Sequence, residues 1–124
     1  MKLAYVDTSC LVAIAFAEQG HEALANELLD FDRLFASNLA EAELLSAFAR
    51  ENADGPAGLL SALTWVFPNR PLTQEYREVL AGGYVRGADL FHLACGLFLR
   101  RELGDLLFLS VDHRQLAVAR SLGM

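Results

Sequence analysis

KLAYVDTS, residues Lys2–Ser9, sets the architecture of this chain. The apolar run Lys2–Val6, partly β-branched and aromatic, predicts a buried strand that ends at Asp7. Cys10–Glu18 follows at once and is apolar on every side, which predicts a buried helix. A buried strand that runs directly into a buried helix is typical of an α/β protein with a parallel sheet.

Beyond this segment, predicted strands and helices alternate along the rest of the chain. Further strands are predicted at 33–37, 64–67 and 106–111, and helices at 21–30, 38–51, 57–63, 72–80, 88–103 and 112–122. A turn at 52–56 and a glycine-rich loop at 81–87 interrupt them, and Asn38 is predicted to cap its helix. The expected structure is therefore one α/β domain over residues 1–124, with helices on both faces of a mostly parallel sheet.

Length and composition agree with a single compact domain. A chain of 124 residues is long enough to bury a core without a disulfide or a structural metal. Its abundance of Leu, Val and Phe excludes an intrinsically disordered protein. Cys10 and Cys95 lie within apolar runs, so we expect buried free thiols in a reducing compartment.

The mean hydropathy of +0.29 requires either a membrane or an unusually large buried surface. No apolar run reaches the roughly 18 residues of a transmembrane helix, and the N-terminal segment does not resemble a signal peptide. We therefore expect a cytoplasmic protein that does not contact a membrane, and we assign the excess apolar surface to self-association or a protein partner. The net charge of −6 argues against nucleic-acid binding, whose proteins usually carry a basic surface.

Three aspartates occupy equivalent positions in the predicted fold. Asp7 follows the first strand, Asp112 follows the last, and Asp89 opens the helix at 88–103. Each could simply cap a helix, because aspartate accepts hydrogen bonds from free N–H groups there. However, ligand sites of α/β proteins lie beyond the carboxyl ends of the strands, where two converging carboxylates would need a divalent cation to relieve their repulsion.

Glu43 is a fourth candidate. On the helix at 38–51 its neighbours one turn away are small or apolar, so its carboxylate needs a partner or must reach solvent. Glu41, an acid in the first turn that the helix dipole favours, is the alternative, and the pattern favours Glu43. Four oxygen ligands without paired His or Cys favour one or two Mg²⁺ or Mn²⁺ ions over Zn²⁺, and such ions serve phosphodiester cleavage.

Four short motifs together resemble the PIN-domain family, and within it the VapC-type ribonuclease toxins of type II toxin–antitoxin systems. They are Val6–Ser9, Ala42–Ala47, Ala88–Ala94 and Leu109–Asp112, followed by Leu116, Ala119 and Gly123. The resemblance spans essentially the whole chain, although residues 52–86 carry little of it.

The resemblance implies a three-layer α/β/α sandwich and an endoribonuclease that hydrolyses RNA with a metal-activated water. Asp7, Glu43, Asp89 and Asp112 match the family's acidic quartet, which binds Mg²⁺ or Mn²⁺ and is catalytic. The hydroxyls of Thr8, Ser9 and Ser110 match groups that position those ligands or the water. Members usually form homodimers and are inhibited by a cognate antitoxin, whose C-terminal segment lies across the site.

Two bound divalent ions would bring the formal net charge from −6 to −2, so an acidic chain can act on RNA. Three nearby residues allow two interpretations each. His92 lies one turn from Asp89 and could join the site, but packing within a buried helix is favoured. Arg86 and Arg114 lie near two of the acids and could contact RNA phosphates or form surface ion pairs.

Other α/β proteins fit less well. A response-regulator receiver domain needs a lysine after its last strand, and Lys2 is the only lysine of the chain. A haloacid dehalogenase-type phosphatase needs a second acid two residues after Asp7, where Ser9 stands. The alternative that the sequence leaves open is a PIN-like scaffold that binds RNA or protein with little or no nuclease activity.

Overall fold

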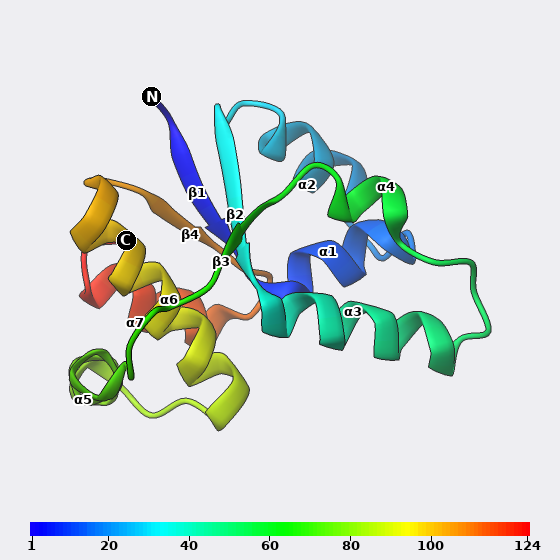
Figure 1. The fold of residues 1–124 in the computed structure, drawn as a ribbon. Helices are drawn as coiled ribbons and strands as arrows, with labels where there is room; N and C mark the ends of the chain where they lie inside the picture. Colours follow the sequence, from blue (N-terminus) through cyan, green and yellow to red (C-terminus); the bar gives the residue numbers. More distant parts are fainter.

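Four parallel strands form the centre of the molecule, in the order β3-β2-β1-β4 (Figure 1). The computed structural model describes residues 1–124. Its strands are β1 (Leu3–Val6), β2 (Arg33–Ser37), β3 (Thr64–Val66) and β4 (Leu107–Leu109). All three pairings are parallel, so the prediction of a parallel α/β sheet is confirmed.

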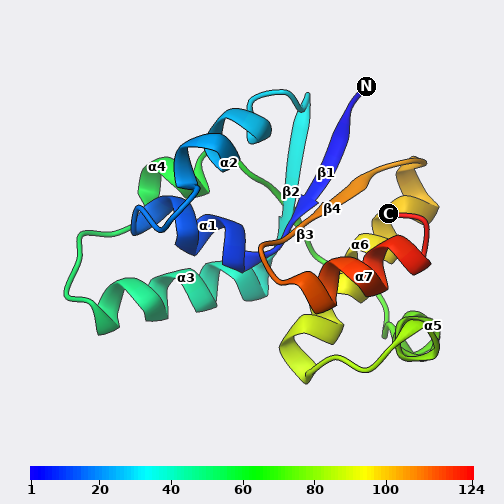
Figure 2. The same ribbon diagram turned by 180° about the vertical axis from the view of Figure 1, so that it is seen from behind.

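Seven helices cover the two faces of this sheet. They are α1 (Thr8–Ala15), α2 (His21–Leu28), α3 (Asn38–Arg50), α4 (Ala57–Leu60), α5 (Thr73–Gly82), α6 (Gly87–Leu103) and α7 (His113–Ser121). Helices α1 to α4 lie on one side of the sheet and α5 to α7 on the other, as Figures 1 and 2 show from opposite directions. The three-layer α/β/α arrangement is therefore confirmed.

Strand β1 connects the two halves of the core because its side chains alternate between the faces of the sheet. Leu3 and Tyr5 pack into the larger core, which α5, α6 and α7 complete. Ala4 and Val6 pack into the smaller core against α1, α2 and α3. A strand that is buried on both faces explains why residues 3–6 are apolar without interruption.

The predicted glycine-rich loop at 81–87 is wrong at both ends. Helix α5 continues through Gly82, and α6 begins at Gly87. A Cβ atom on Gly82 would lie 2.6 Å from the Ser121 hydroxyl, so glycine here allows α5 to approach α7 rather than ending the helix. Strand β4 is also shorter than the predicted 106–111, and α4 is a single turn rather than a helix over 57–63.

The predicted cap of α3 is wrong by one residue. Ser37, in extended conformation with φ −82° and ψ 164°, is the N-cap, and Asn38 is already the first helical residue. Ser37 is also the last residue of β2, which spans the predicted 33–37. Serine and asparagine are equally good N-caps, so the local signal did not distinguish these two neighbours.

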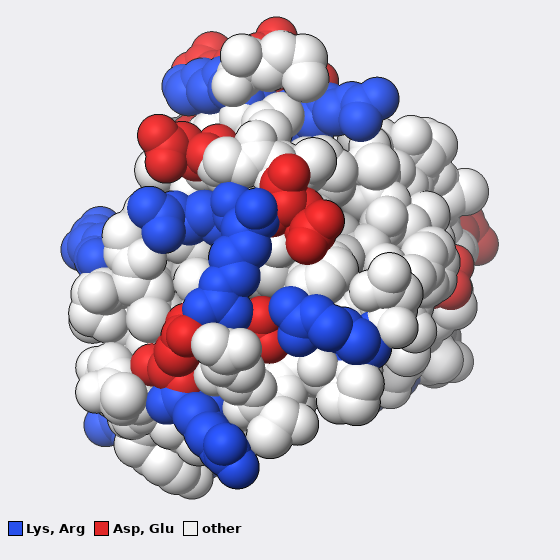
Figure 3. Space-filling model, turned by 60° about the vertical axis from the view of Figure 1, so that its left-hand side comes forward, with Lys and Arg blue, Asp and Glu red and all other residues white.

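A buried ion-pair network joins α5 to α6. The side chain of Glu75 is fully buried and accepts hydrogen bonds from both guanidinium nitrogens of Arg70 at 2.9 and 2.7 Å. Arg101 donates to the same carboxylate at 2.6 Å and also pairs with the more exposed Glu78. On this side of the molecule basic and acidic side chains alternate across the surface (Figure 3).

Both cysteines are buried and free, as the sequence predicts. Burial raises the pKa of the Cys10 and Cys95 thiols to about 12, which leaves them protonated and unreactive at neutral pH. No helix of the protein is both long enough and apolar enough to cross a membrane.

Candidate active site

The strand order places the acids at a reversal in the sheet. The chain builds the sheet from β1 through β2 to β3, and then returns to add β4 on the other side of β1. Helices that leave two neighbouring strands in opposite directions open a crevice beyond their carboxyl ends. Asp7 follows β1 directly and Asp112 follows β4 after two residues, so both lie at this crevice.

Asp7 is fixed by two hydrogen bonds. Its Oδ2 accepts from the Ser9 backbone N–H at 3.0 Å, which makes Asp7 the N-cap of α1. Its Oδ1 accepts from the Gln115 side-chain amide at 3.0 Å. The residue is only 4% exposed, so the capping interpretation is confirmed but does not account for the second, long-range bond.

Asp112 caps α7 in the same way and keeps one oxygen free. Its Oδ1 accepts from the backbone N–H groups of Arg114 and Gln115 at 2.9 and 3.1 Å. Its Oδ2 accepts no hydrogen bond, and the residue is exposed. Asp112 can therefore stabilise the helix and still offer an oxygen to a ligand.

Gln115 connects these two acids and is a site residue that sequence reasoning missed. It is 1% exposed; its amide nitrogen donates to Asp7, and its amide oxygen accepts from the Ser110 hydroxyl at 2.6 Å. The Ser110 hydroxyl also lies 3.3 Å from that of Ser9. The spacing Asp112-x-x-Gln115 is that of a capping box, a signal that could have drawn attention to Gln115.

Glu43 belongs to a second hydrogen-bonded group. Its Oε1 lies 2.6 Å from His92 Nε2 and 2.9 Å from the Thr8 hydroxyl, which donates to it. A carboxylate only accepts, so Nε2 carries a proton, and in the neutral ring Nδ1 accepts from the Tyr5 hydroxyl at 2.7 Å. Tyr5 and His92 are buried, and they hold Glu43 in one orientation.

These contacts change the charge properties of Glu43. Burial by itself raises the pKa of this carboxyl group, but the hydrogen bond from His92, the positive charge of that ring whenever it is protonated, and the hydrogen bond from Thr8 outweigh burial and lower the pKa. Glu43 is therefore ionised at neutral pH. By contrast, Glu41 is exposed on the same helix, and no hydrogen bond reaches its side chain.

His92 is packed in a buried helix, as the sequence interpretation favoured, but it also belongs to the site. The two possibilities are not exclusive, because a fully buried imidazole must satisfy both ring nitrogens. Asp89 and His92 are three residues apart on α6, so both face the crevice. That spacing is the sequence signal for His92.

Asp89 lies among the other acids and has no partner of its own. It stands in the first turn of α6, but Arg86 is the N-cap, so the capping interpretation is wrong for Asp89. Its half-buried carboxylate makes no hydrogen bond. Burial raises its pKa, and the nearby charges of Asp7, Asp112 and Glu43 raise it further, with only His92 opposing them.

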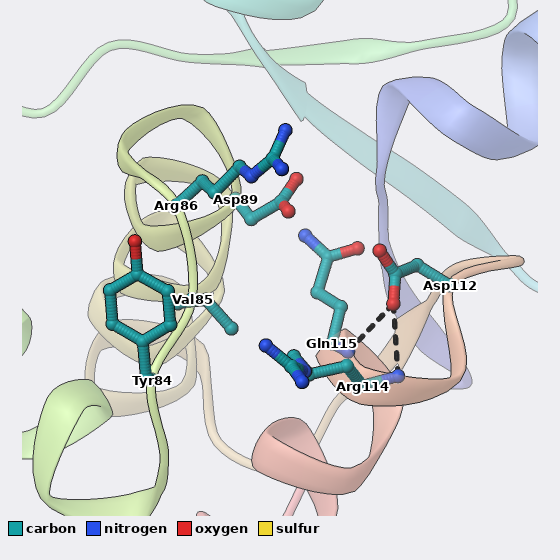
Figure 4. Close-up of a pocket in the computed structure, with 7 residues that line it drawn as sticks. All are labelled: Tyr84, Val85, Arg86, Asp89, Asp112, Arg114 and Gln115. Carbon is teal, nitrogen blue, oxygen red and sulfur yellow. Dashed lines mark hydrogen bonds between the residues drawn. The ribbon is translucent and has the colours of Figure 1, made fainter.

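Two hollows meet at Asp89. One is lined by Asp7, Thr8, Ser9, Glu43 and His92 among others. The other is lined by Tyr84, Val85, Arg86, Asp112, Arg114 and Gln115, and we refer to it as the α6–α7 cleft. Figure 4 shows Tyr84, Arg86 and Asp89 on one side of this cleft and Asp112, Arg114 and Gln115 on the other.

The four acids share the crevice, but they do not form a compact ligand cluster. No three His, Cys, Asp or Glu side chains come close enough together to hold one ion. The hydrogen bonds above explain this spacing, since Gln115 holds Asp7, the α7 backbone holds Asp112 and His92 holds Glu43. The unpartnered Asp89 and the free Asp112 oxygen nevertheless fit a hard divalent cation, which prefers oxygen ligands.

Replacing Asp89 by asparagine is expected to stabilise the protein in EDTA. Because folding raises the pKa of Asp89, its ionisation weakens the fold as pH rises through that pKa, and asparagine removes this cost at pH 7. Repulsion and burial here exceed the favourable helix dipole, and the partly exposed site limits the gain to less than about 1 kcal/mol. The gain in stability is measured as a rise in Tm by thermal unfolding. Asp54→Asn, on an exposed loop, should change nothing, and a lower Tm for Asp89→Asn than for wild type would contradict the prediction.

Comparison with known proteins identifies one family. The family model described as PIN domain matches residues 4–121, nearly the whole chain. No curated protein sequence matches the chain significantly.

Proposed function

Since the chain belongs to the PIN-domain family, whose model covers residues 4–121, we propose that it is a Mg²⁺- or Mn²⁺-dependent endoribonuclease and, within the family, a VapC-type toxin. PIN domains are generally nucleases that use divalent metal ions, so the chain has a nuclease-type fold. The observation that carries the proposal is the crevice itself. Four carboxylates from four different segments face this crevice, and the other three raise the pKa of Asp89, whose own carboxylate forms no hydrogen bond or ion pair.

Each acid has a role in this proposal. Asp7, Glu43, Asp89 and Asp112 would hold one or two ions, and a bound divalent cation supplies positive charge for the scissile phosphate and lowers the pKa of its bound water. The remaining polar groups keep Asp7 and Glu43 oriented. Thr8 and His92 hold Glu43, while Ser9 and Gln115 hold Asp7, and Ser110 orients Gln115.

Cleavage assays test the proposed activity. The purified protein is incubated with end-labelled RNA in Mg²⁺, in Mn²⁺ and in excess EDTA, and the products are separated by gel electrophoresis. We expect internal cleavage with either ion and none in EDTA. Cleavage that persists in EDTA would contradict metal dependence.

Growth tests the toxin role. Induced expression in a bacterial host should arrest growth, and co-expression of the neighbouring reading frame should restore it if that frame encodes the antitoxin. Growth that is unaffected by the induced, soluble protein would count against a toxin.

We also propose a homodimer and a cognate antitoxin as partners. Large apolar side chains that stay exposed support this, such as Leu29 at 81% and Phe67 at 66%. Sedimentation analysis should give twice the mass of the 13.6 kDa chain. A monomer at micromolar concentration would contradict the dimer without affecting the nuclease.

The second candidate function is a scaffold that binds RNA or protein without cleaving. The observation that favours it is the missing three-ligand cluster, because a nuclease must hold its ion tightly enough to use it. Calorimetric titration with Mn²⁺ discriminates the two functions. Saturable binding that Asp89→Asn weakens supports the nuclease, whereas no measurable binding supports the scaffold.

His92 is predicted to act through Glu43. His92→Leu removes the donor to Glu43 and should weaken Mn²⁺ binding by about 10- to 100-fold, the range for residues that orient metal ligands. His92→Gln can still donate from an amide and should retain more affinity. Tyr5→Phe removes only the hydrogen bond on the far side of the His92 ring and should lower the Mn²⁺ affinity less than His92→Leu. Wild-type Mn²⁺ affinity in a folded His92→Leu protein would contradict this role.

A further inference from the structure

We propose that the α6–α7 cleft holds one unpaired nucleotide of the RNA beside the bond to be cleaved, with Tyr84 stacked on its base and Arg86 and Arg114 on its phosphate. This inference rests on the proposed ribonuclease function and adds to it a position for one nucleotide and the residues that hold that nucleotide. Stacking on Tyr84 requires a base that is free of its own stack, so a fully paired RNA could not occupy this position.

The loop between α5 and α6 is built to present Tyr84. Val85, in the middle of residues 84–86, is only 5% exposed and is part of the larger core, whereas Tyr84 is 70% exposed. Arg86, whose backbone is extended, is exposed like Tyr84, so the side chains on both sides of the buried Val85 face outward. Gly83 anchors the loop from the other end, since a Cβ there would lie 2.9 Å from a Val118 methyl group. The exposed ring is therefore on a fixed support.

Arg86 and Arg114 are the cationic groups of the cleft, and neither forms an ion pair. Both line it together with Asp89 and Asp112, yet no salt bridge or side-chain hydrogen bond engages either guanidinium. Elsewhere the chain uses its arginines differently, as Arg70 and Arg101 are bound to Glu75. Free guanidinium groups on opposite walls suit a phosphate, which arginine binds through paired N–H groups.

The size and charge of the cleft point to a single nucleotide. Its volume of about 310 Å³ is at the low end of small-molecule sites and suits one nucleotide. A chain of net charge −6 does not attract RNA over a long distance, so contacts at the site must supply the affinity. Stacking on an aromatic ring needs an unstacked base, which only single strands, loops and bulges offer.

Binding measurements test this inference separately from cleavage. Fluorescence anisotropy follows a short fluorescein-labelled single-stranded RNA of mixed sequence, in Mg²⁺, with every variant made in the Asp7→Asn protein to suppress turnover. Tyr84→Ala should weaken binding roughly tenfold, and Tyr84→Phe, which keeps the ring, about twofold or less. Arg114→Ala should weaken RNA binding. It should also make the slope of log K against log salt concentration shallower by about 0.7, the value for one phosphate contact in single strands. Circular dichroism checks that each variant is folded.

Arg33→Ala is the matched control. Arg33 is an exposed arginine that forms no ion pair, and it is the first residue of β2, at the end of the strand away from the crevice. This variant should bind as well as the parent protein, and a fully paired duplex of the same sequence should bind at least tenfold more weakly than the single strand. Equal binding by Tyr84→Ala and its parent, or equal affinity for duplex and single strand, would overturn the inference. If Tyr84→Ala weakens RNA binding but the wild type cleaves no RNA, the nucleotide position in the α6–α7 cleft is supported and the proposed nuclease activity is contradicted.

Discussion

Asp7→Asn is expected to lower metal-dependent RNA cleavage by roughly 100-fold or more, because it removes a charged ligand from the crevice. Asp7 is 4% exposed, and its two hydrogen bonds hold it between Ser9 and Gln115. Asparagine is as good an N-cap as aspartate and retains one acceptor oxygen, but its amide nitrogen would face the Gln115 amide, so the free energy of unfolding should fall by about 1–3 kcal/mol. Chemistry should be lost while the fold remains.

Three measurements on the same preparation decide the outcome. Cleavage of labelled RNA in Mn²⁺ gives the rate, calorimetric titration gives the affinity for Mn²⁺, and thermal unfolding gives the stability. Asp54→Asn makes the same chemical change on an exposed loop and should match the wild type in all three. A folded Asp7→Asn protein that cleaves as fast as the wild type would show that the acids of this crevice do not carry the reaction.

Glu75→Gln is expected to reduce stability by about 2–3 kcal/mol. The carboxylate of Glu75 is fully buried and accepts charge-assisted hydrogen bonds from Arg70 and Arg101. Glutamine keeps the shape but offers one acceptor oxygen and an amide nitrogen that faces donors. The network joins α5 to α6. Its loss should therefore loosen the loop between these helices, which contains Tyr84, and the first turn of α6, which contains Asp89.

Urea unfolding measures this loss, and Glu78→Gln is the matched control. Glu78 lies on the same helix and pairs with the same Arg101, but its side chain is 37% exposed. An exposed pair contributes about 1 kcal/mol or less, so the control should lose far less stability than Glu75→Gln. Equal losses of stability for the two variants would contradict the prediction, because burial of the Glu75 ion pairs would then contribute nothing to stability.

The same residue predicts a pH dependence. The hydrogen bonds of Arg70 lower the pKa of Glu75 from its ordinary 4.5 to about 2, outweighing burial, which raises it, and Arg101 adds to the lowering. The folded state thus binds this proton less readily than the unfolded state. The contribution of Glu75 is fully present above pH 4.5 and is lost as pH falls toward 2. The stability difference between wild type and Glu75→Gln should therefore shrink over this interval.

Much of the fold could be predicted because its signals are local. The apolar run at residues 3–6 specifies a strand buried on both faces, and the acids that follow β1 and β4 cap the next helices as expected. The boundary errors have different causes. Gly82 stays helical because α7 lies against it. Ser37 rather than Asn38 caps α3, and serine and asparagine are equally good N-caps.

The four acids could likewise be selected by position alone, but their partners could not. Glu43 stood out because a carboxylate on an apolar helix face needs a partner, yet nothing in that pattern identifies His92, 49 residues away. Gln115 bonds Asp7 across 108 residues, and Glu75 is buried by Arg101, 26 residues away. The separate hydrogen bonds of these acids also keep any three of them from forming one ligand cluster, a spacing that no local pattern could show.

Local patterns were thus sufficient to predict a parallel α/β domain with acids at the ends of its strands, because periodicity and capping depend on residues within a turn or two of each other. The folded chain was needed to find the hydrogen-bonded partners of Asp7 and Glu43, the burial of Glu75, and the exposed ring of Tyr84 beside two free arginines. A sequence pattern shows which face of an element is buried. It does not show which residues of another element that face will meet.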